Sequence, residues 1–325
     1  MRHVRMLGVC VAAVFAMSAV ALVSAVPALA KGRIVGDGPG ATTHAAEWEL
    51  FEHCPFHHTP QINKCIWGES APGSEFTAGN VTVHFNHPIQ IQGGALEEVY
   101  ENEKEELVFT EHFYPPEDGT PVISKVAQTA PSLENDVEPA LLSEQERKHY
   151  EHVVAVGHTK VTATVEVAGN PTEVFLDEGN LLDERGVALS LPVKIKLSNY
   201  FLGKECYVGS DAKPVFIELT TGLTKPPPPN EPIHGSAGHI SVPGHDDKET
   251  GHTLQILKDT ENVLLDNEYA APGVEGCGKE GAANAALDAK LGLPSAAGHN
   301  VAVIHGILEQ AGPKETEEAF QEFGI

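Results

Sequence analysis

Histidine and aspartate side chains in the middle of the chain could bind a transition metal ion. His239, His245, Asp247 and His252 lie within one segment that is rich in glycine and polar residues. Imidazole and carboxylate ligands suit zinc, nickel or copper. The spacing matches no paired helical motif such as H-E-x-x-H, and histidines in polar loops are commonly exposed side chains without a ligand. The four residues are therefore weak candidates for a metal site, and we predict no bound cofactor.

Two cysteines and two histidines near residue 60 form a second set that could bind a metal. Cys54 and Cys65 enclose His57 and His58, and two thiolates with two imidazoles would complete a tetrahedral zinc site. Outside the cytoplasm, however, closely spaced thiols oxidise. A disulfide is therefore the stronger expectation for an exported chain.

The four cysteines that follow residue 30 allow three disulfide pairings. The loop between Cys54 and Cys65 is short and contains two prolines, so these cysteines can close a local ring. A rival pairing requires each of them to find a separate distant partner. We therefore predict Cys54–Cys65 and, by elimination, Cys206–Cys277.

Catalytic motifs of recognised spacing do not occur in the sequence. The serines at Ser236 and Ser295 lie among small residues, but neither has the G-x-S-x-G spacing of a nucleophile elbow. A pair of carboxylates could still hydrolyse a glycosidic bond, because their separation is set in space and not in sequence. With 46 Asp and Glu residues, the sequence identifies no particular pair.

The charge of the chain argues against two classes of partner. The formal net charge is −25, with 21 Lys and Arg residues. Binding to a nucleic acid backbone requires clustered basic residues that release counterions, and attraction to an anionic membrane surface requires the same sign of charge. We therefore predict no nucleic acid partner, and we expect the excess of carboxylates to keep the protein soluble.

Residues 1–30 have the three regions of a secretory signal peptide. Arg2 and Arg5 precede an apolar run, and the segment ends in Pro27-Ala28-Leu29-Ala30, a small-residue cleavage site. No later apolar run is long enough to span a membrane. We expect a protein that begins near Lys31 after cleavage and is extracellular, either free or associated with the cell envelope.

Apolar and polar residues alternate in several segments, which is typical of strands with one buried face. The clearest segments are 81–91, 161–167, 191–197 and 215–219, and further candidates are 252–258, 262–270 and 299–309. Turn-forming residues are frequent, with 31 glycines and 23 prolines. The pattern predicts an all-β fold, a sandwich or barrel of mainly antiparallel strands.

Helices are expected to be one or two in number and short. Residues 282–291 are rich in alanine and end at Gly292, and residues 143–150 are a second candidate. The predicted organisation is a flexible segment at 31–46, one β-rich domain at 47–311 and an acidic tail at 312–325, with a short acidic helix as the alternative for this tail. Within the domain lie an acidic stretch at 96–118, which lacks the spacing of a calcium loop, and a Pro-rich connection at 225–232.

Several short sequence motifs along the chain resemble those of a group of proteins. They are Cys54-Pro55 to Cys65, Gly79-Asn80 through Gln92-Gly93-Gly94, Leu191-Pro192-Val193-Lys194 through Asn199 to Cys206, Leu219-Thr220-Thr221-Gly222, Cys277-Gly278 and Gly292-Leu293-Pro294-Ser295. In these the chain resembles exported actinobacterial proteins of unknown function. The resemblance implies a compartment and no catalytic residues.

The sequence therefore favours a secreted, noncatalytic binding or structural module. The alternatives are a secreted hydrolase, acting on glycans through a carboxylate pair, and a histidine-rich metal-binding protein. An enzyme should have a concave pocket with two buried carboxylates of shifted pKa, whereas a binding module should have an apolar patch or a lined cavity.

Overall fold

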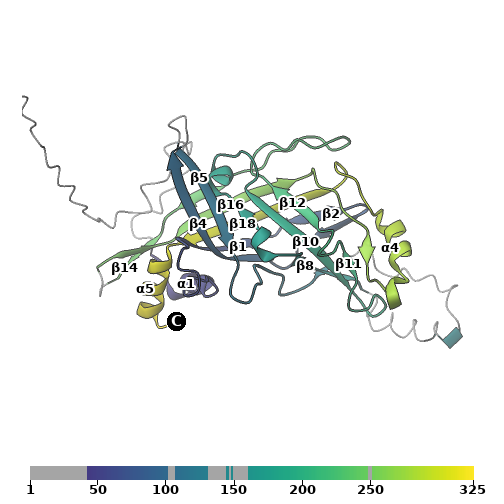
Figure 1. Cartoon of the computed structure of the whole chain (residues 1–325), viewed down its shortest axis with the longest axis horizontal. Helices are drawn as coiled ribbons and strands as arrows, with labels where there is room; N and C mark the ends of the chain where they lie inside the picture. The colour runs from purple at the N-terminus through teal and green to yellow at the C-terminus, as the bar shows by residue number, and fades with distance from the viewer. Residues whose placement is uncertain (1–41, 102–106, 131–143, 146–147, 149–159, 248–250) are drawn as a thin grey trace, which may run out of the picture.

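The computed structural model describes residues 42–101, 107–130, 144–145, 148, 160–247 and 251–325. The predicted signal peptide, most of segment 31–46 and most of the second helix candidate lie outside the described residues. Two antiparallel sheets form the body of the protein (Figure 1). The predicted all-β fold is therefore confirmed, and of the two predicted architectures the protein has the sandwich. Among the described residues, no helix has the length and apolar character needed to cross a membrane.

The first sheet is built around the long strand β18. Its order is β13-β16-β18-β1-β4-β5, with β2 paired to β18 and β3, and with β6 paired to β4. The strands are β1 (Lys64–Ser70), β2 (Glu75–Ala78), β3 (Val81–His84), β4 (Gln90–Glu101), β5 (Leu107–Tyr114), β6 (Val122–Ile123), β13 (His239–Ser241), β16 (Leu257–Asp266) and β18 (Val301–Ala311). The acidic stretch is therefore largely the hairpin of β4 and β5.

The second sheet is built around β10, whose alternating residues gave the clearest strand signal. Its order is β17-β11-β10-β8-β7, with β12 and β9 also paired to β10. The strands are β7 (Gln128–Thr129), β8 (Thr162–Val167), β9 (Phe175–Leu176), β10 (Leu189–Ser198), β11 (Tyr207–Val208), β12 (Val215–Leu219) and β17 (Val274–Glu275). A separate hairpin is formed by β14 (Gly244–Asp246) and β15 (Thr253–Gln255).

The two sheets are joined along one edge of the sandwich. Thr220, which follows β12, exchanges two backbone hydrogen bonds with Leu265 of β16, at 2.9 and 2.8 Å. The Pro-rich connection at 225–232 follows this bridge and leads the chain from β12 to β13, as a link between strands. This contact fixes the spacing of the sheets at one side.

Two hydrophobic cores lie on opposite faces of the first sheet. The inter-sheet core is made of apolar residues from both sheets, among them Ile66, Val193 and Leu308. The outer core includes Trp48 and Trp67 and is covered by α1 (Ala45–Trp48), the 3₁₀ turn η2 (Glu49–Phe51) and α5 (Pro313–Phe323). The helices α1 and α5 lie at the same end of the molecule, and α4 (Asn284–Leu291) lies toward the other end (Figure 1).

The helices are more numerous than the sequence predicted. The described residues contain four α-helices, with α3 (Glu178–Leu182) as the fourth, where one or two were predicted. The acidic segment at the end takes the helical alternative as α5, because Thr316, Ala319, Phe320 and Phe323 share a face that packs on the outer core. Thr43, in the segment predicted to be flexible, is buried and accepts a hydrogen bond from the Trp48 indole at 3.1 Å.

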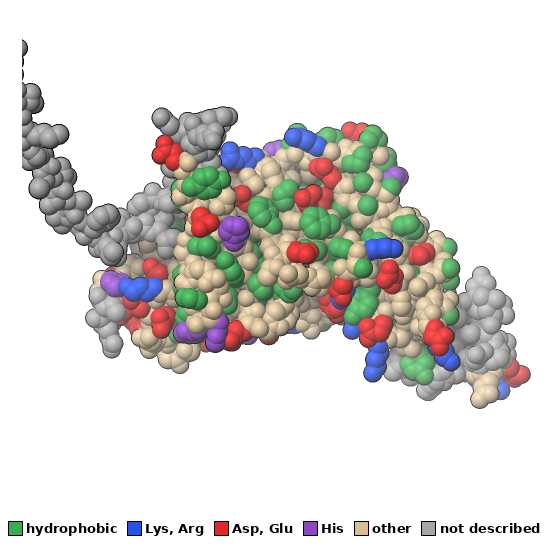
Figure 2. All heavy atoms as spheres, viewed as in Figure 1, with side chains coloured by type: hydrophobic (Ala, Val, Ile, Leu, Met, Phe, Trp, Pro, Cys, Tyr) green, Lys and Arg blue, Asp and Glu red, His purple; other side chains and the backbone are tan. Residues whose placement is uncertain are grey.

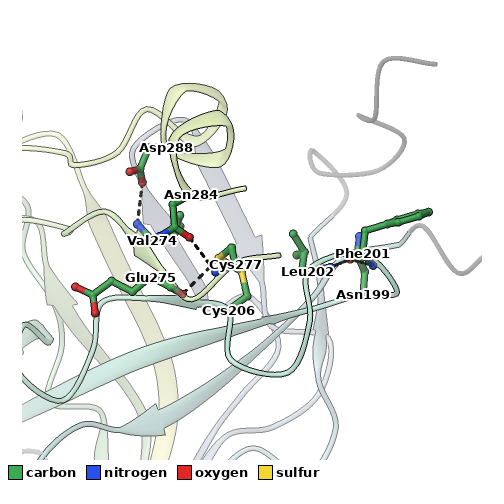
Figure 3. Close-up of a disulfide and its surroundings, with 9 residues drawn as sticks. All are labelled: Asn199, Phe201, Leu202, Cys206, Val274, Glu275, Cys277, Asn284 and Asp288. Carbon is green, nitrogen blue, oxygen red and sulfur yellow. Dashed lines mark hydrogen bonds between the residues drawn. A yellow bond between two sulfur atoms is a disulfide. The ribbon is translucent and has the colours of Figure 1, made fainter. Parts of the chain in front are cut away.

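Both disulfides form with the predicted pairing. Cys54–Cys65 lies in the outer core, and Cys206–Cys277 lies in the inter-sheet core. Figure 3 shows the second disulfide beneath α4, where the Asn284 side chain accepts a hydrogen bond from the Cys277 backbone N–H at 2.9 Å. The helix α4 ends at Gly292 in the left-handed conformation, as its sequence predicted.

Acidic side chains are scattered over the outer surface. Figure 2 shows them on one face of the molecule, with Lys and Arg side chains interspersed among them. On the second sheet, Lys194 forms an ion pair with Asp211 at 2.8 Å, and Lys196 one with Glu166 at 3.9 Å. The basic residues of this sheet are thus paired with carboxylates.

Candidate functional site

A cavity lies between the two sheets. Its volume is about 130 Å³. The first sheet contributes lining residues such as Ile91 and Ile304, and the second contributes Leu191, Val165 and Ile217. Leu191 and Val165 are only partly buried, although their neighbours along and across the strands are core residues. Most of the residues that line the cavity are apolar.

Two glycines on neighbouring strands keep side chains out of part of this space. Gly68 of β1 and Gly306 of β18 both line the cavity. A Cβ atom at Gly68 would lie 2.9 Å from the Ile91 side chain, and one at Gly306 would lie 2.9 Å from the Glu69 carbonyl oxygen. Substitution at either position would force its neighbours to move, so the close packing of the backbone here depends on glycine.

A few polar groups line the cavity, and most of them bond to one another. The Gln90 amide donates to the Glu69 carboxylate at 2.7 Å, and Ser70 Oγ accepts from the Ile89 backbone N–H at 2.9 Å. Asn262 differs from them. It is 2% exposed, and its Oδ1 has no hydrogen-bond partner among the described residues.

Asn262 reaches the cavity because of an irregularity in β16. The pairing of β16 with β18 shifts register between Thr260 and Asn262, and Glu261 between them has a positive φ of 59°. Such a bulge inserts one extra residue and reorients the side chains that follow it. Asn262 and Asp259 therefore both lie on the inner face, and Asn262 Nδ2 donates weakly to Asp259 Oδ2 at 3.4 Å.

Asp259 is a buried carboxyl behind the cavity lining. Burial raises its pKa to about 8, and the nearby Glu178 carboxylate acts in the same direction. Its Oδ1 also has no hydrogen-bond partner in the described part of the chain. A buried carboxylate without a cation is unfavourable, so burial favours the protonated form of Asp259.

A cluster of charged residues lies at one end of the inter-sheet space. The Lys64 ammonium group is 2.8 Å from Glu178 Oε2, 3.1 Å from Glu97 Oε2 and 3.6 Å from Glu111 Oε1. The side chains come from β1, β4, β5 and α3, so the cluster joins the first sheet to the helix that packs beneath it. The Glu178 backbone N–H also donates to Glu111 Oε2 at 3.2 Å.

Burial and the neighbouring charges shift the pKa values of the residues in this cluster. Burial lowers the pKa of Lys64, but the carboxylates of Glu178 and Glu111 outweigh this and hold it above its usual value. Burial raises the pKa of Glu111 to about 7, with Lys64 acting in the opposite direction. The ammonium group already occupies the centre of the cluster, so the arrangement is that of a buried ion-pair network.

The buried carboxylates with shifted pKa do not line the cavity. Glu111, Asp259, Asp266 and Glu309 are absent from its wall, whereas a glycosidase requires both carboxyl groups at the surface that binds the substrate. Glu69 is the carboxylate among the described residues that line the cavity, and its Oε2 accepts a hydrogen bond from the Gln90 side chain. In the described part of the chain, the cavity wall therefore brings no pair of carboxylates together.

The residues predicted as metal candidates do not converge on one point. His245 pairs with Glu322 at 2.9 Å and His252 with Glu318 at 3.2 Å, so the β14–β15 hairpin is fastened to α5. His239 lies near Glu261 at 3.3 Å instead, and the Asp247 backbone N–H donates to the His252 carbonyl oxygen. In the described part of the chain, no group of three or more potential ligands could hold a metal ion.

Sequence reasoning identified neither Asn262 nor Lys64. A signal existed for Asn262, a polar residue at the start of an otherwise apolar run, but its side chain could be placed only once the bulge was known. Lys64 follows a polar loop and has no local pattern, because its three partners come from distant segments.

No family model, no curated protein and no solved structure matches this chain.

Proposed function

We propose that this chain is a secreted, noncatalytic binding protein that holds a small apolar ligand between its two sheets. The observation that carries the proposal is the inter-sheet cavity, which is lined by aliphatic side chains and has a volume of about 130 Å³. An apolar cavity of about 150 Å³ in another protein admits benzene. The expected occupant is a molecule or group of about the size of one aromatic ring.

The position of the buried carboxylates supports binding over hydrolysis. Those with a raised pKa lie outside the cavity wall, so they would not reach a bond held at its centre; they are Asp259, Glu111, Asp266 and Glu309. A catalytic acid must come within hydrogen-bond distance of the atom that it protonates. The proposed ligand is therefore held and released unchanged.

Secretion is part of the proposal and rests on two observations. The leader has the regions of a signal peptide, and the two disulfides suit an oxidising compartment. N-terminal sequencing of protein from culture supernatant should give a start within a few residues of Lys31. A product that keeps residues 1–30 in a membrane fraction would contradict this part.

Toluene is a suitable probe for the cavity. A ligand that binds only the folded state raises the melting temperature, so toluene should stabilise the protein and give a saturable signal in calorimetric titration. Val165→Phe, which adds a ring to the lining, should abolish binding. Val303→Phe is the matched control, because Val303 is a partly buried strand residue that does not line the cavity.

Two results would refute the cavity as the binding site. One is a lack of toluene binding up to its solubility limit. The other is binding that persists unchanged in Val165→Phe but disappears in Val303→Phe.

A further inference from the structure

We infer that the ligand is phenol-like, an apolar ring that carries one hydrogen-bond donor, and that Asn262 Oδ1 accepts a hydrogen bond from that donor. The inference rests on the proposed function and specifies the chemistry of its ligand. It starts from the one wall residue described above whose buried oxygen has no partner among the described residues.

The orientation of the Asn262 amide decides which atom faces the ligand. Its Nδ2 donates to Asp259 Oδ2 at 3.4 Å, and this oxygen can accept whether or not Asp259 Oδ1 carries a proton. The reverse orientation would place Oδ1 beside Asp259 Oδ2, and a hydrogen bond would then need the carboxyl proton to lie on Oδ2. In the orientation of the structure, the carbonyl oxygen of Asn262 has no hydrogen-bond partner among the described residues, and it can only accept.

The other polar side chains of the wall each have a hydrogen bond within the protein. Glu69 and Gln90 bond to each other, and Ser70 Oγ accepts a backbone N–H. Asn262, in contrast, is almost completely buried and leaves an acceptor unsatisfied, which destabilises a fold unless a ligand or an ordered molecule supplies a donor. A hydroxyl group on an otherwise apolar ring supplies one donor and little further polar surface.

Gly306 keeps the space in front of Asn262 open. A Cβ atom at Gly306 would lie 3.3 Å from Asn262 Oδ1, in the region where a donor would approach. Both residues belong to the wall and are opposite each other in the pairing of β16 with β18. The bulge and the glycine together place the Asn262 side chain in the wall of the cavity.

Three probes of similar size separate this inference from the proposed function. Toluene tests the apolar cavity alone, phenol adds a donor, and anisole carries an oxygen that can only accept. In the wild-type protein, phenol should bind at least as tightly as toluene and about tenfold more tightly than anisole, because burying a hydroxyl group without a partner carries a penalty of that order. This comparison needs no substitution and is independent of how any variant folds.

Asn262→Leu, which has nearly the same shape, should bind toluene within about threefold of the wild type and phenol about tenfold more weakly. Asn267→Leu is the matched control. Asn267 is also buried with an unpartnered Oδ1 in the described structure, but it does not line the cavity, so its substitution should leave the ratio of phenol to toluene affinity unchanged.

The outcomes distinguish the two proposals. If toluene binds and phenol binds tenfold more weakly than toluene to the wild type, the inference is wrong and the cavity remains a purely apolar site. If phenol is favoured equally by the wild type and Asn262→Leu, Asn262 is not the acceptor. If no probe binds, the proposed function itself fails.

Discussion

The two hydrophobic cores of the protein are built from different side chains. The outer core contains both tryptophans of the chain, and several phenylalanines pack around them. The inter-sheet core consists mainly of leucine, isoleucine, valine and alanine from facing strands. None of the buried residues of the outer core lines the cavity, which lies within the aliphatic core.

The difference shows that a correct hydrophobic pattern does not ensure a filled interior. Rows of aliphatic residues such as those of β10 satisfy the alternation of a strand, but their volume need not match the distance between two sheets that are joined at an edge. Aromatic side chains and a docked helix adapt the outer core to its space. The inter-sheet core, with Gly68 and Gly306 in its wall, leaves room for a ligand.

The disulfides should contribute unequally to the two cores. In the chain-entropy model, a disulfide stabilises more when it closes a longer loop, and the sequence separations are 71 for Cys206–Cys277 and 11 for Cys54–Cys65. Replacing both cysteines of Cys206–Cys277 by alanine should lower the free energy of unfolding by about 4 kcal/mol. The same change at Cys54–Cys65 should lower it by somewhat under about 3 kcal/mol. Urea unfolding measures both. A larger loss for the short loop would show that the outer core depends more on its disulfide.

Truncation of a side chain should have a larger effect where packing is complete. Phe51→Ala, at a residue that is 1% exposed in the outer core, should lower the free energy of unfolding by about 4 kcal/mol. Leu191→Ala should lower it by about 2 kcal/mol, since Leu191 already faces a cavity and gives up fewer contacts. Equal losses in urea unfolding would indicate that a ligand or solvent fills the cavity.

The buried carboxyl groups make the inter-sheet region sensitive to pH. Burial raises the pKa of Asp259 to about 8 and that of Glu111 to about 7, both above their values in an unfolded chain. The folded state therefore binds protons that the unfolded state has released, so stability is greatest at low pH and falls as the pH rises from about 4 to 8. The expected slope near pH 6 is on the order of 1 kcal/mol per pH unit.

Asp259→Asn should reduce this slope by about half, because the amide does not titrate while Glu111 still does. Glu101→Gln, at an exposed carboxylate of β4, is the control and should leave the slope as it is. Unfolding curves between pH 4.5 and 8 provide the measurement, as an order-of-magnitude test of the linkage. A wild-type slope of the opposite sign would mean that Asp259 and Glu111 are ionised and paired in the folded protein.

The smallest expected difference in stability between the two cores comes from adding one methyl group to each. Val165→Ile places it in the cavity and should stabilise the protein by about 0.5 kcal/mol. Ala311→Val places it among the packed residues of the outer core and should destabilise by about 1 kcal/mol. Thermal unfolding without ligand tests both signs, and two destabilising changes would mean that the cavity closes in solution.

Much of the fold could be predicted from local patterns. Alternation predicted β8, β10 and β12 nearly to their ends, because each has one face on the core and one on solvent. The short loop between Cys54 and Cys65 was enough to predict both disulfides. The segment predicted as one strand at 252–258 is two, with the boundary at Ile256.

Other features depended on contacts between distant segments. Glu97 and Glu111 of the acidic stretch turn inward because Lys64 neutralises them, although their sequence resembles a solvated surface. The apolar face of α5 had a signal in the spacing of Ala319, Phe320 and Phe323, which the many glutamates obscured. The cavity has no sequence signal, since Leu191 has the pattern of an ordinary core residue.

The position of β18 has a consequence for the order of assembly during synthesis. This strand, the latest in the sequence, lies between β16 and β1 and also pairs with β2. Until residues 301–311 have been synthesised, the early strands β1 to β4 and the late strand β16 cannot join in one sheet. Contacts of such long sequence separation slow folding, and they leave strand edges open to other chains in the meantime. A nascent chain of this protein therefore completes its first sheet only after residues 301–311 have emerged from the ribosome.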